Sequence, residues 1–451
     1  MDRRNFIMAS IGCASIGSLV STEALAKSSE QVKIFNSVAE LKLSALSVSE
    51  YAMTLGYYEP GDNGGAVYKI NNPSNSFDGF GSHQLSNNNI ATLTSGSESG
   101  AKVVKLEQFG MKSGDKSKDY VHHLNAALNY ADTILLSGSY FVSNVILPNK
   151  HLTLKSIGEK YSAGFVACDS IDGSHSQEYF VAPSTWVDNG DWVNAPVKMY
   201  GITLDAGPSR QICLVVRFYF GVMEDLTITN GSQYGLYMTA KNSEGGVHED
   251  ATMVNNVFRN LKINGSSKVG MFVDEDGKST DWMLDNGFIY NKGLINLSAR
   301  TLAGAHIRGV HFYDSETSME LHKFSTGTII EANYCEGGVT IKGGIAGHHL
   351  TFGPANYLKK QLRLDYSNVN NAIKSVNNTL KSVRHNYWGD RKFYSINDTL
   401  TSSSPFSFMN NGRGNRASIR VKHAMIGFEQ YSGELSPAKG MSNSSALIND
   451  F

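Results

Sequence analysis

Short apolar runs alternate with polar turns over most of this chain, and near its middle the pattern becomes strictly periodic. Four similar segments follow one another at a step of 23 residues: GFIYN at 287–291, VHFYD at 310–314, NYCEG at 333–337 and NYLKK at 356–360. The last two follow an alanine, at Ala332 and Ala355, so that both carry the triplet Ala-Asn-Tyr. A repeat of roughly 20–30 residues is typical of a solenoid, in which each unit buries its apolar face against its neighbours.

The repeat also predicts which side chains point inward. Aligning the four segments gives one apolar column, which consists of Ile289, Phe312, Cys335 and Leu358. Neighbouring side chains of a strand point to opposite faces. The two flanking columns are therefore expected on the outer face: Phe288, His311, Tyr334 and Tyr357 in one, and Tyr290, Tyr313, Glu336 and Lys359 in the other. The same alignment, moved back by three residues, stacks Asp285, Arg308 and Glu331 on successive coils.

The chain divides into four regions by pattern. Residues 1–26 resemble a twin-arginine export signal, with Arg3-Arg4, an apolar stretch and an Ala24-Leu25-Ala26 cleavage site; the alternative is an uncleaved N-terminus. Residues 27–105 carry short strand-like runs and form a β-rich module. A helix is expected over 119–130 and strands near 133–136 and 140–147. Coils are expected over 106–385, and residues 386–451, where the pattern is lost, are expected to form a cap or assembly region.

Composition fits an exported or extracellular β-rich protein. The chain has 451 residues, of which 44 are Gly and only 9 are Pro. Its 40 basic and 41 acidic residues give a net charge of −1, which provides no electrostatic reason to expect binding to nucleic acid or to an anionic membrane. Outside the N-terminal segment no apolar run is long enough to predict a membrane span. Cys168, Cys213 and Cys335 have no paired spacing that would indicate a disulfide framework.

Several motifs resemble one known family. The segment GYYEPGDNGGAVY at 56–68 is similar to the entry module of phage tailspikes and capsule depolymerases of the pectate-lyase-like, right-handed parallel β-helix type. The segment FGMKSGD at 109–115 resembles the start of the helix in these proteins, although only Asp115 and Asp119 remain of the family's more acidic version. Three further segments resemble central coils: Asp281-Trp282, His311 to Asp314, and Asn333 to Glu336.

The resemblance implies an all-β fold, namely a right-handed parallel β-helix with a small N-terminal module and a C-terminal cap. It also implies a homotrimer that acts on a bacterial surface polysaccharide from the tail of a virion. The chain departs from a virion spike at its N-terminus, where a signal-like segment stands in place of a particle-binding domain. Export to the periplasm or to the extracellular space is therefore the alternative location.

Cleavage of a glycosidic bond needs two carboxylates that flank it, or, in a lyase, a base that removes the proton beside a uronate carboxylate. Coils in parallel pairing lie ~4.8 Å apart, so Asp285 and Glu331, two coils apart, are expected ~10 Å from each other. That spacing is near the upper end of the range of inverting glycosidases, but it suits an ion pair centred on Arg308 equally well. We predict Glu336 as one working acid, with Asp285, Glu331 or Asp281 as the other.

Substrate-binding residues are expected beside these acids on the same outer face. Tyrosines can stack on sugar rings and donate hydrogen bonds, although an aromatic ladder can also simply stiffen a sheet. The expected binding residues are Arg308, His311, Tyr290, Tyr313, Tyr334, Trp282 and Asp314. His122-His123 and His348-His349 lack companions that would complete a metal site, and no cofactor is expected. If the protein is a lyase, the Asp274–Asp276 loop is the expected position of a calcium ion.

These observations predict an enzyme that degrades a polysaccharide, with hydrolysis favoured over elimination. An exported bacterial polysaccharide lyase is the first alternative, in which Arg308 neutralises a uronate and β-elimination follows. A non-catalytic adhesin that binds glycan on the same scaffold is the second alternative.

Overall fold

The computed structural model describes residues 32–445 apart from short gaps at 74–75, 95–99, 159–161, 169–177, 266, 275–278, 326, 344–348, 367–371, 388–391, 403–405, 410–417, 427–428 and 436–443. The signal-like segment 1–26 lies outside the described residues. The chain forms two compact units. Unit 1 comprises Met1–Gly173 with Met199–Ile202, and unit 2 comprises Ser174–Lys198 with Thr203–Phe451.

Unit 1 begins with the expected β-rich module. Its five-stranded sheet has the order β1 (Lys33–Phe35), β2 (Tyr51–Thr54), β3 (Val67–Asn71), β5 (Ile90–Leu93) and β4 (Ser82–Gln84), and the short helix α3 (Val38–Lys42) follows β1. The turn between β2 and β3 is organised by Asp62. Its carboxylate accepts hydrogen bonds from the backbone N–H groups of four residues, Tyr57, Tyr58, Glu59 and Gly64. This contact explains why the Pro-Gly-Asp-Asn-Gly-Gly motif forms a turn.

The rest of unit 1 contains the first coils. The expected helix forms as α4 (Val121–Tyr130) and buries Leu124, Ala127 and Leu128. The other elements are β6 (Val103–Lys105), η1 (Leu106–Phe109), β7 (Thr133–Leu136), β8 (Ser139–Val142), β9 (Val145–Leu147), β10 (Leu152–Ser156) and β11 (Ala163–Ala167). Parallel pairs join β6 to β7, β7 to β10 and β8 to β11.

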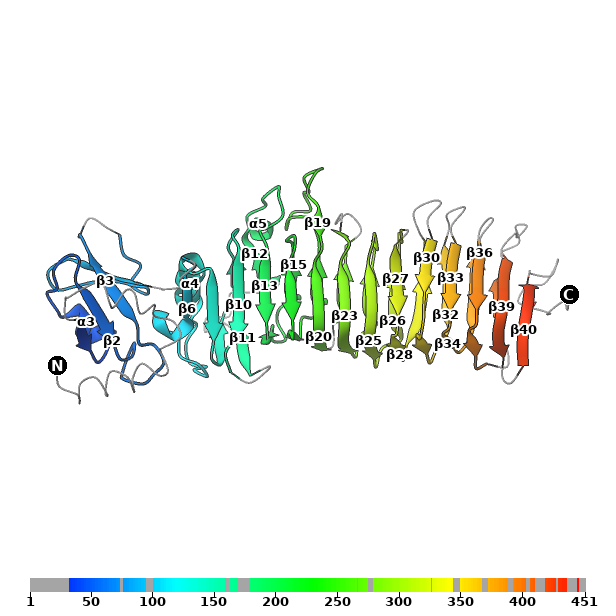
Figure 1. Ribbon diagram of the computed structural model, residues 1–451, viewed down its shortest axis with the longest axis horizontal. Helices are drawn as coiled ribbons and strands as arrows, with labels where there is room; N and C mark the ends of the chain where they lie inside the picture. Colours follow the sequence, from blue (N-terminus) through cyan, green and yellow to red (C-terminus); the bar gives the residue numbers. More distant parts are fainter. Residues whose placement is uncertain are drawn as a thin grey trace. The chain divides into compact units, whose positions relative to one another are not determined.

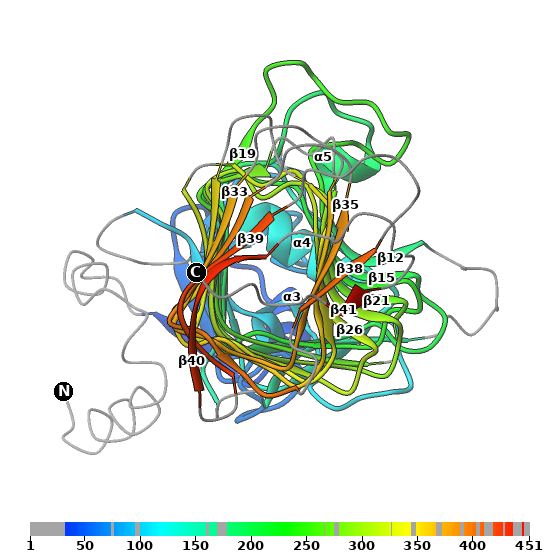
Figure 2. The same ribbon diagram turned by 90° about the vertical axis from the view of Figure 1, so that its right-hand side faces the viewer.

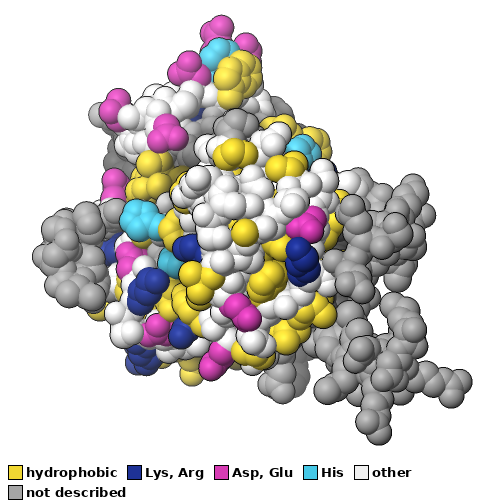
Figure 3. Space-filling model, turned by 90° about the vertical axis from the view of Figure 1, so that its left-hand side faces the viewer, with side chains coloured by type: hydrophobic (Ala, Val, Ile, Leu, Met, Phe, Trp, Pro, Cys, Tyr) yellow, Lys and Arg dark blue, Asp and Glu magenta, His cyan; other side chains and the backbone are white. Residues whose placement is uncertain are grey.

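Figure 3 shows a face of the molecule on which acidic, basic and histidine side chains lie interspersed among hydrophobic and uncharged ones.

Unit 2 is a parallel β-solenoid whose coils follow one another along the chain (Figure 1) and project onto one another in the perpendicular view (Figure 2). Each coil contributes one strand to what we call the straight sheet: β12 (Tyr179–Pro183), β15 (Ile212–Val216), β18 (Tyr234–Met238), β21 (Val269–Val273), β24 (Ile295–Ala299), β26 (Thr317–Leu321), β29 (Gly338–Ile341), β32 (Leu362–Tyr366), β35 (Val383–Tyr387) and β38 (Phe406–Met409). β41 (Ser444–Ser445) pairs antiparallel with β38.

The remainder of each coil lies in what we call the bent sheet. Its strands are β16 (Val222–Glu224), β17 (Thr227–Thr229), β20 (Val257–Gly265), β23 (Met283–Asn291), β25 (His306–Tyr313), β27 (Thr328–Glu331), β28 (Tyr334–Cys335), β30 (His349–Phe352), β31 (Tyr357–Leu358), β33 (Ala372–Val376), β34 (Thr379–Leu380), β36 (Lys392–Ile396), β37 (Thr399–Leu400) and β39 (Ser418–Ile426). β13 (Val197–Tyr200) and β14 (Ile202–Asp205) contain the points where the chain passes between the units. Insertions carry helix α5 (Ser184–Val187) and the pair β19 (Met253–Val254) and β22 (Ser279–Thr280).

The predicted 23-residue register is confirmed. Ile289 pairs with Phe312, Phe312 with Cys335, and Cys335 with Leu358. All four side chains are at most 2% exposed, so the apolar column points inward as expected. Upstream the steps are longer: Ile228 pairs with Ile263, 35 positions on, and Ile263 with Ile289, 26 positions on. Loops inserted between coils account for the longer steps.

A single residue bends each coil within the bent sheet. Asn286, Gly309 and Ala332 adopt left-handed backbone conformations, with φ of 54°, 65° and 54°. Ala355, Asn377 and Asn397 repeat this conformation on later coils, with φ of 67°, 52° and 53°. Gly, Asn and Asp reach this region at low cost, whereas alanine pays ~1–2 kcal/mol. The two halves of the bent sheet are therefore joined by one residue and not by a loop.

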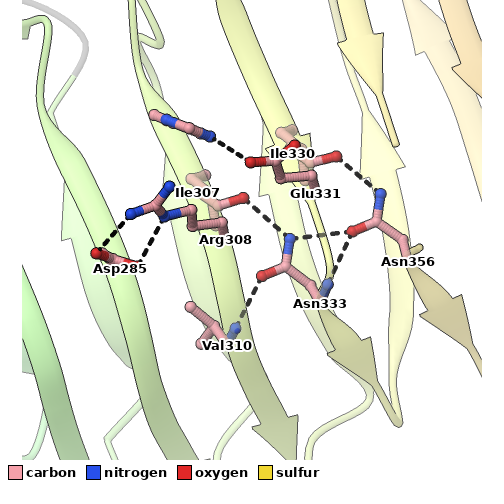
Figure 4. A network of polar contacts seen from close by, with 9 residues as sticks. Asp285, Ile307, Arg308, Val310, Ile330, Glu331, Asn333 and Asn356 are labelled. Atoms are coloured by element: carbon pink, nitrogen blue, oxygen red, sulfur yellow. Dashed lines mark hydrogen bonds and ion pairs between the residues drawn. The ribbon is translucent and has the colours of Figure 1, made fainter. Parts of the chain in front are cut away.

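The residue after each of the last four bends belongs to an internal hydrogen-bonded column, which we call the asparagine ladder: Asn333, Asn356, Asn378 and Asp398. Figure 4 shows Asn333 and Asn356, the first two rungs. Each is at most 2% exposed. The Oδ1 atom of one rung accepts a bond from the backbone N–H of the preceding rung, at 3.1 Å for Asn333 to Asn356 and 2.9 Å for both Asn356 to Asn378 and Asn378 to Asp398. The ladder satisfies donors that the left-handed bend removes from the regular strand pairing.

The coils continue beyond residue 385, where the sequence pattern placed their end. β36 pairs in parallel with β33 and β39, and β37 pairs in parallel with β34 and β39. Asp398 continues the asparagine ladder in this region. The direction reverses only at β40 (Glu429–Leu435), which pairs antiparallel with β39. The cap therefore begins later than expected, because shorter steps of 22 and 20 residues (Tyr357 to Thr379, Thr379 to Thr399) conceal the repeat from a search at 23.

Candidate functional site

The outward aromatic columns form one continuous series of ring contacts, which we call the aromatic ladder: Phe288, Tyr290, His311, Tyr313, Tyr334 and Tyr357. Tyr290 and Tyr313 stack with ring centroids 5.4 Å apart, and Tyr334 and Tyr357 stack at 5.2 Å and 6°. His311 joins the two halves through an edge contact with Tyr334 at 4.6 Å. Phe288 and Tyr313 are each 37% exposed and Tyr357 is 42% exposed. The ladder thus presents ring surface to solvent over four successive coils.

Glu336 stands beside this ladder as an ion-paired carboxylate. Its Oε1 lies 2.6 Å from Nζ of Lys359 and 4.0 Å from Nε2 of His311. The hydrogen bond to Glu336 raises the pKa of Lys359. Burial lowers the pKa of His311, so its imidazole is neutral at pH 7 and the 4.0 Å contact is not a salt bridge there. Lys359 also lies over the ring of Tyr334, 5.2 Å from its centroid.

Arg308 pairs with only one of the two acids that share its column (Figure 4). Its Nε and Nη2 donate to the two carboxylate oxygens of Asp285, at 2.8 and 2.9 Å. This bidentate bond lowers the pKa of Asp285, so Asp285 stays ionised at neutral pH. Glu331 instead contacts Nε2 of His306, at 2.9 Å. An Asp285–Glu331 pair bridged by Arg308 is therefore not what the side chains form.

The bend separates these acids from the aromatic ladder. Asp285, Arg308 and Glu331 each lie one residue before a left-handed position, and the ladder lies after it. A strict period of two would place Asp285 and Phe288 on opposite faces of an unbent strand, because they are three positions apart. The left-handed residues at 286, 309 and 332 redirect the chain between them, so both sets lie on the outside of the coil, the acids before the corner and the ladder after it.

Two expected site residues lie in a different setting. Trp282 is 0% exposed, so the expectation that it stacks on a sugar is wrong: as the residue before strand β23 it fills the core. Asp281 is exposed, has φ of 55° and donates its backbone N–H to the carbonyl of Ala303 at 2.8 Å. It lies at the opposite end of β23 from Tyr290. Asp314 is exposed after Tyr313, also with a left-handed φ of 56°.

A second constellation, on the straight sheet, was missed by the sequence analysis. We call it the Arg300 cluster: Arg300, Glu320, His322 and Lys342. A single atom, Oε1 of Glu320, lies 2.8 Å from Nζ of Lys342, 2.9 Å from Nε2 of His322 and 4.0 Å from Nη1 of Arg300. The hydrogen bond from His322, together with Lys342, lowers the pKa of Glu320 to about 2. The cluster therefore holds a permanently ionised carboxylate.

Aromatic rings and a second carboxylate adjoin the Arg300 cluster. Arg300 lies over the ring of Phe272, 5.9 Å from its centroid, and Phe272 stacks on Tyr234 at 5.0 Å and on Tyr237 at 5.7 Å. The hydroxyl of Tyr237 donates to Oδ2 of Asp274 at 2.7 Å. Backbone pairing places Asp274, Arg300, His322 and Lys342 at one position of successive coils. Their numbers differ by 26, 22 and 20, so a search at a fixed period of 23 does not align them.

The described part of the chain contains no preformed metal site. Among these residues, no group of three or more His, Cys, Asp and Glu side chains is placed to hold an ion. Of the Asp274–Asp276 loop considered for calcium, only Asp274 is among the described residues. The search for membrane spans, over the same residues, finds no helix with the length and apolar character needed to cross a bilayer.

Comparisons with known proteins show the fold. The structure is similar to the gp42 tailspike of Acinetobacter phage vb_AbaP_AS12, with a TM-score of 0.52 and 14% identity over 94% of this chain and 78% of the tailspike. Tailspike protein 2 of Escherichia coli O157:H7 bacteriophage CAB120 has a TM-score of 0.45 and 10% identity, over 92% of this chain and 57% of the tailspike. Tailspike gp49 of Acinetobacter baumannii bacteriophage Fri1 has a TM-score of 0.42 and 11% identity, over 88% of this chain and 69% of the tailspike. No family model matches the sequence, and no curated protein matches it. The chain thus has the parallel β-solenoid fold of phage tailspikes, as its motifs predicted.

Proposed function

We propose that this protein is a polysaccharide depolymerase that cleaves glycosidic bonds in bacterial capsular polysaccharide or O-antigen. The observation that carries the proposal is the aromatic ladder, which exposes ring faces on four successive coils beside an ion-paired carboxylate. Rings that stay 37–42% exposed bury only part of their apolar surface, so the stability of the solenoid alone does not account for them. The fold shared with a phage tailspike supports the same function.

Glu336 remains our candidate for one working acid, and Glu331 is the preferred partner among the three alternatives. Proton transfer requires a side chain that can change its protonation state in the complex. Glu331 is hydrogen-bonded to the imidazole of His306 and not to an arginine. Asp285 is held by two bonds from Arg308 and remains ionised. It therefore suits stabilisation of positive charge on the sugar better than proton donation.

Incubation with a panel of bacterial capsules and O-antigens tests the activity. New reducing ends without ultraviolet absorbance indicate hydrolysis, whereas an unsaturated uronate product indicates the lyase alternative. Glu336→Gln and Glu331→Gln should each lower kcat by at least about 100-fold, the usual contribution of general acid–base catalysis. Asp285→Asn and Asp281→Asn complete the set of candidates. Glu224→Gln is the matched control, because Glu224 is also a half-exposed strand carboxylate paired with an arginine, Arg259, at 3.8 Å.

Three outcomes would count against parts of this proposal. Binding of glycan without any cleavage would leave a non-catalytic adhesin. Full activity in all four candidate variants would refute the site. Activity lost equally in Glu224→Gln would show that the loss reflects folding and not chemistry.

The assembly and location that we propose follow the tailspike likeness: a homotrimer on the tail of a virion. The alternative is export through the twin-arginine-like segment 1–26. Light scattering of the purified chain tests the trimer, because a monomeric mass at working concentration would contradict it. Expression in a bacterium with and without a functional twin-arginine pathway tests the export route.

A further inference from the structure

The Arg300 cluster combines an excess of positive charge with a donor edge that the protein itself leaves unused. Arg300 and Lys342 face one carboxylate, Glu320, so these three side chains carry a net charge of +1. Arg300 contacts His322 at 3.3 Å and Glu320 at 4.0 Å, both through Nη1. Within the described part of the chain, Nε and Nη2 of Arg300 have no hydrogen-bond partner. These two donors form the edge that matches a carboxylate in a bidentate contact.

The cations of the cluster are accessible and fixed in place. The side chains of Arg300 and Lys342 are 38% and 36% exposed, whereas that of Glu320 is only 14% exposed. Glu320 is therefore more buried than either cation, and the guanidinium of Arg300 lies over the ring of Phe272. A fixed guanidinium loses less side-chain freedom when it binds an anion than a flexible one does. The arrangement is that of a preorganised anion site and not of a neutral ion pair.

Flat aromatic surface continues from the guanidinium along the straight sheet. Phe272, Tyr234 and Tyr237 lie with interplanar angles of 13° to 20° to one another, and each is partly exposed. Parallel rings beside a guanidinium edge complement a pyranose that carries a carboxylate, because the apolar face of the sugar can stack while the acid group pairs with the cation. An inorganic anion would use the cations alone.

We infer that the Arg300 cluster, with Phe272 and its neighbouring tyrosines, is a subsite for an acidic sugar, namely a pyranose with a carboxylate substituent such as a uronic acid. This inference rests on the proposed function and narrows its substrate class to polysaccharides that contain such a sugar. The carboxylate lies against Nε and Nη2 of Arg300 and on the same side as Lys342, which is two coils away at ~4.8 Å per coil. Glu320 contacts Arg300, His322 and Lys342 without occupying that edge.

Binding of alginate oligosaccharides tests the subsite without requiring catalysis. The wild-type protein is expected to bind them at least ten-fold more tightly than the same oligosaccharides with their carboxylates reduced to alcohols. The difference should shrink with added salt, because the contact is electrostatic. Arg300→Gln and Lys342→Met should each weaken binding of the native oligosaccharide by about ten-fold, which corresponds to ~1.4 kcal/mol. Lys33→Met is the matched control, since Lys33 is also an exposed lysine paired with a glutamate, Glu50, at 3.1 Å, and should bind like wild type.

Equal affinity for native and reduced oligosaccharides, no binding of either, or unchanged affinity in Arg300→Gln would each overturn the inference. Circular dichroism of the two variants must match wild type, so that lost affinity is not lost fold. If the protein degrades a neutral capsule but does not bind alginate, the acidic subsite is refuted and the proposed function is not. If the protein binds alginate through its carboxylates but degrades no capsule, the proposed function is refuted and the acidic subsite is not.

Discussion

The asparagine ladder predicts a large loss of stability when a single rung is removed. In Asn356→Ala, the backbone N–H of Asn333 loses its bond to Oδ1 of residue 356, and the described residues offer it no second acceptor. An orphaned buried donor costs ~1–3 kcal/mol. The bonds from Nδ2 of Asn356 to the carbonyl of Ile330, at 2.8 Å, and to Asn378, at 3.1 Å, are also lost. Because that carbonyl still accepts from Gly353, these losses add only about 1 kcal/mol.

The free energy of unfolding of Asn356→Ala should therefore fall by ~2–4 kcal/mol. Equilibrium unfolding in guanidinium chloride, followed by circular dichroism, measures the change. Thr351→Ala is the control, because Thr351 is an exposed residue on the adjoining strand β30, and surface substitutions usually change stability by less than ~0.5 kcal/mol. If Asn356→Ala costs no more than Thr351→Ala, the ladder does not contribute as its contacts indicate, and the reasoning is refuted.

Asp398→Asn should raise stability at pH 7. Burial raises the pKa of Asp398, so the folded state holds this proton more tightly than the unfolded chain does. The folded state therefore loses stability as the pH rises from about 4, the ordinary aspartate pKa. The free energy of unfolding of the variant should depend less on pH across this range, and parallel pH curves for variant and wild type would contradict the prediction. Ala332→Gly should leave the free energy of unfolding unchanged or raise it by up to ~1 kcal/mol, whereas Ala332→Val should lower it by at least ~2 kcal/mol, because φ is 54° at this position. Equal thermal unfolding midpoints for the two variants would contradict the backbone strain. Tyr313→Ala should weaken binding of a degraded capsule by about ten-fold in affinity electrophoresis, since it removes one stacking surface, and unchanged retardation would exclude Tyr313 from the binding surface.

The 23-residue step made much of the fold predictable from the sequence. Ile289, Phe312, Cys335 and Leu358 are inward because strand alternation and coil spacing are both regular there. Alternation could not reveal the bend, since the left-handed residue at 332 is an alanine, which ordinarily avoids that conformation. The same triplet contains Asn333, whose role depends on a partner 23 residues away. A repeat marks such a residue but does not state that it faces inward.

The Arg300 cluster was not predictable for a different reason. Its members come together only through pairing between strands of the straight sheet, and the loops between those strands differ in length. A sequence pattern reports residues at constant spacing, whereas an electrostatic site requires only that side chains meet. Glu320 therefore appeared as one carboxylate among many. The contacts of its Oε1 atom with Arg300, His322 and Lys342 distinguish it from the others.

The one-residue bend also determines where the coil can change in length. Asn286, Gly309 and Ala332 each turn the chain without a loop, so this corner offers no exposed connection into which residues can be inserted. The variation between a step of 35 and a step of 20 residues must be accommodated at the other corners. Surface loops are the segments that accept insertions and acquire new contacts. New specificity in this protein can therefore arise around the straight sheet while the bend, and the register that depends on it, stays unchanged.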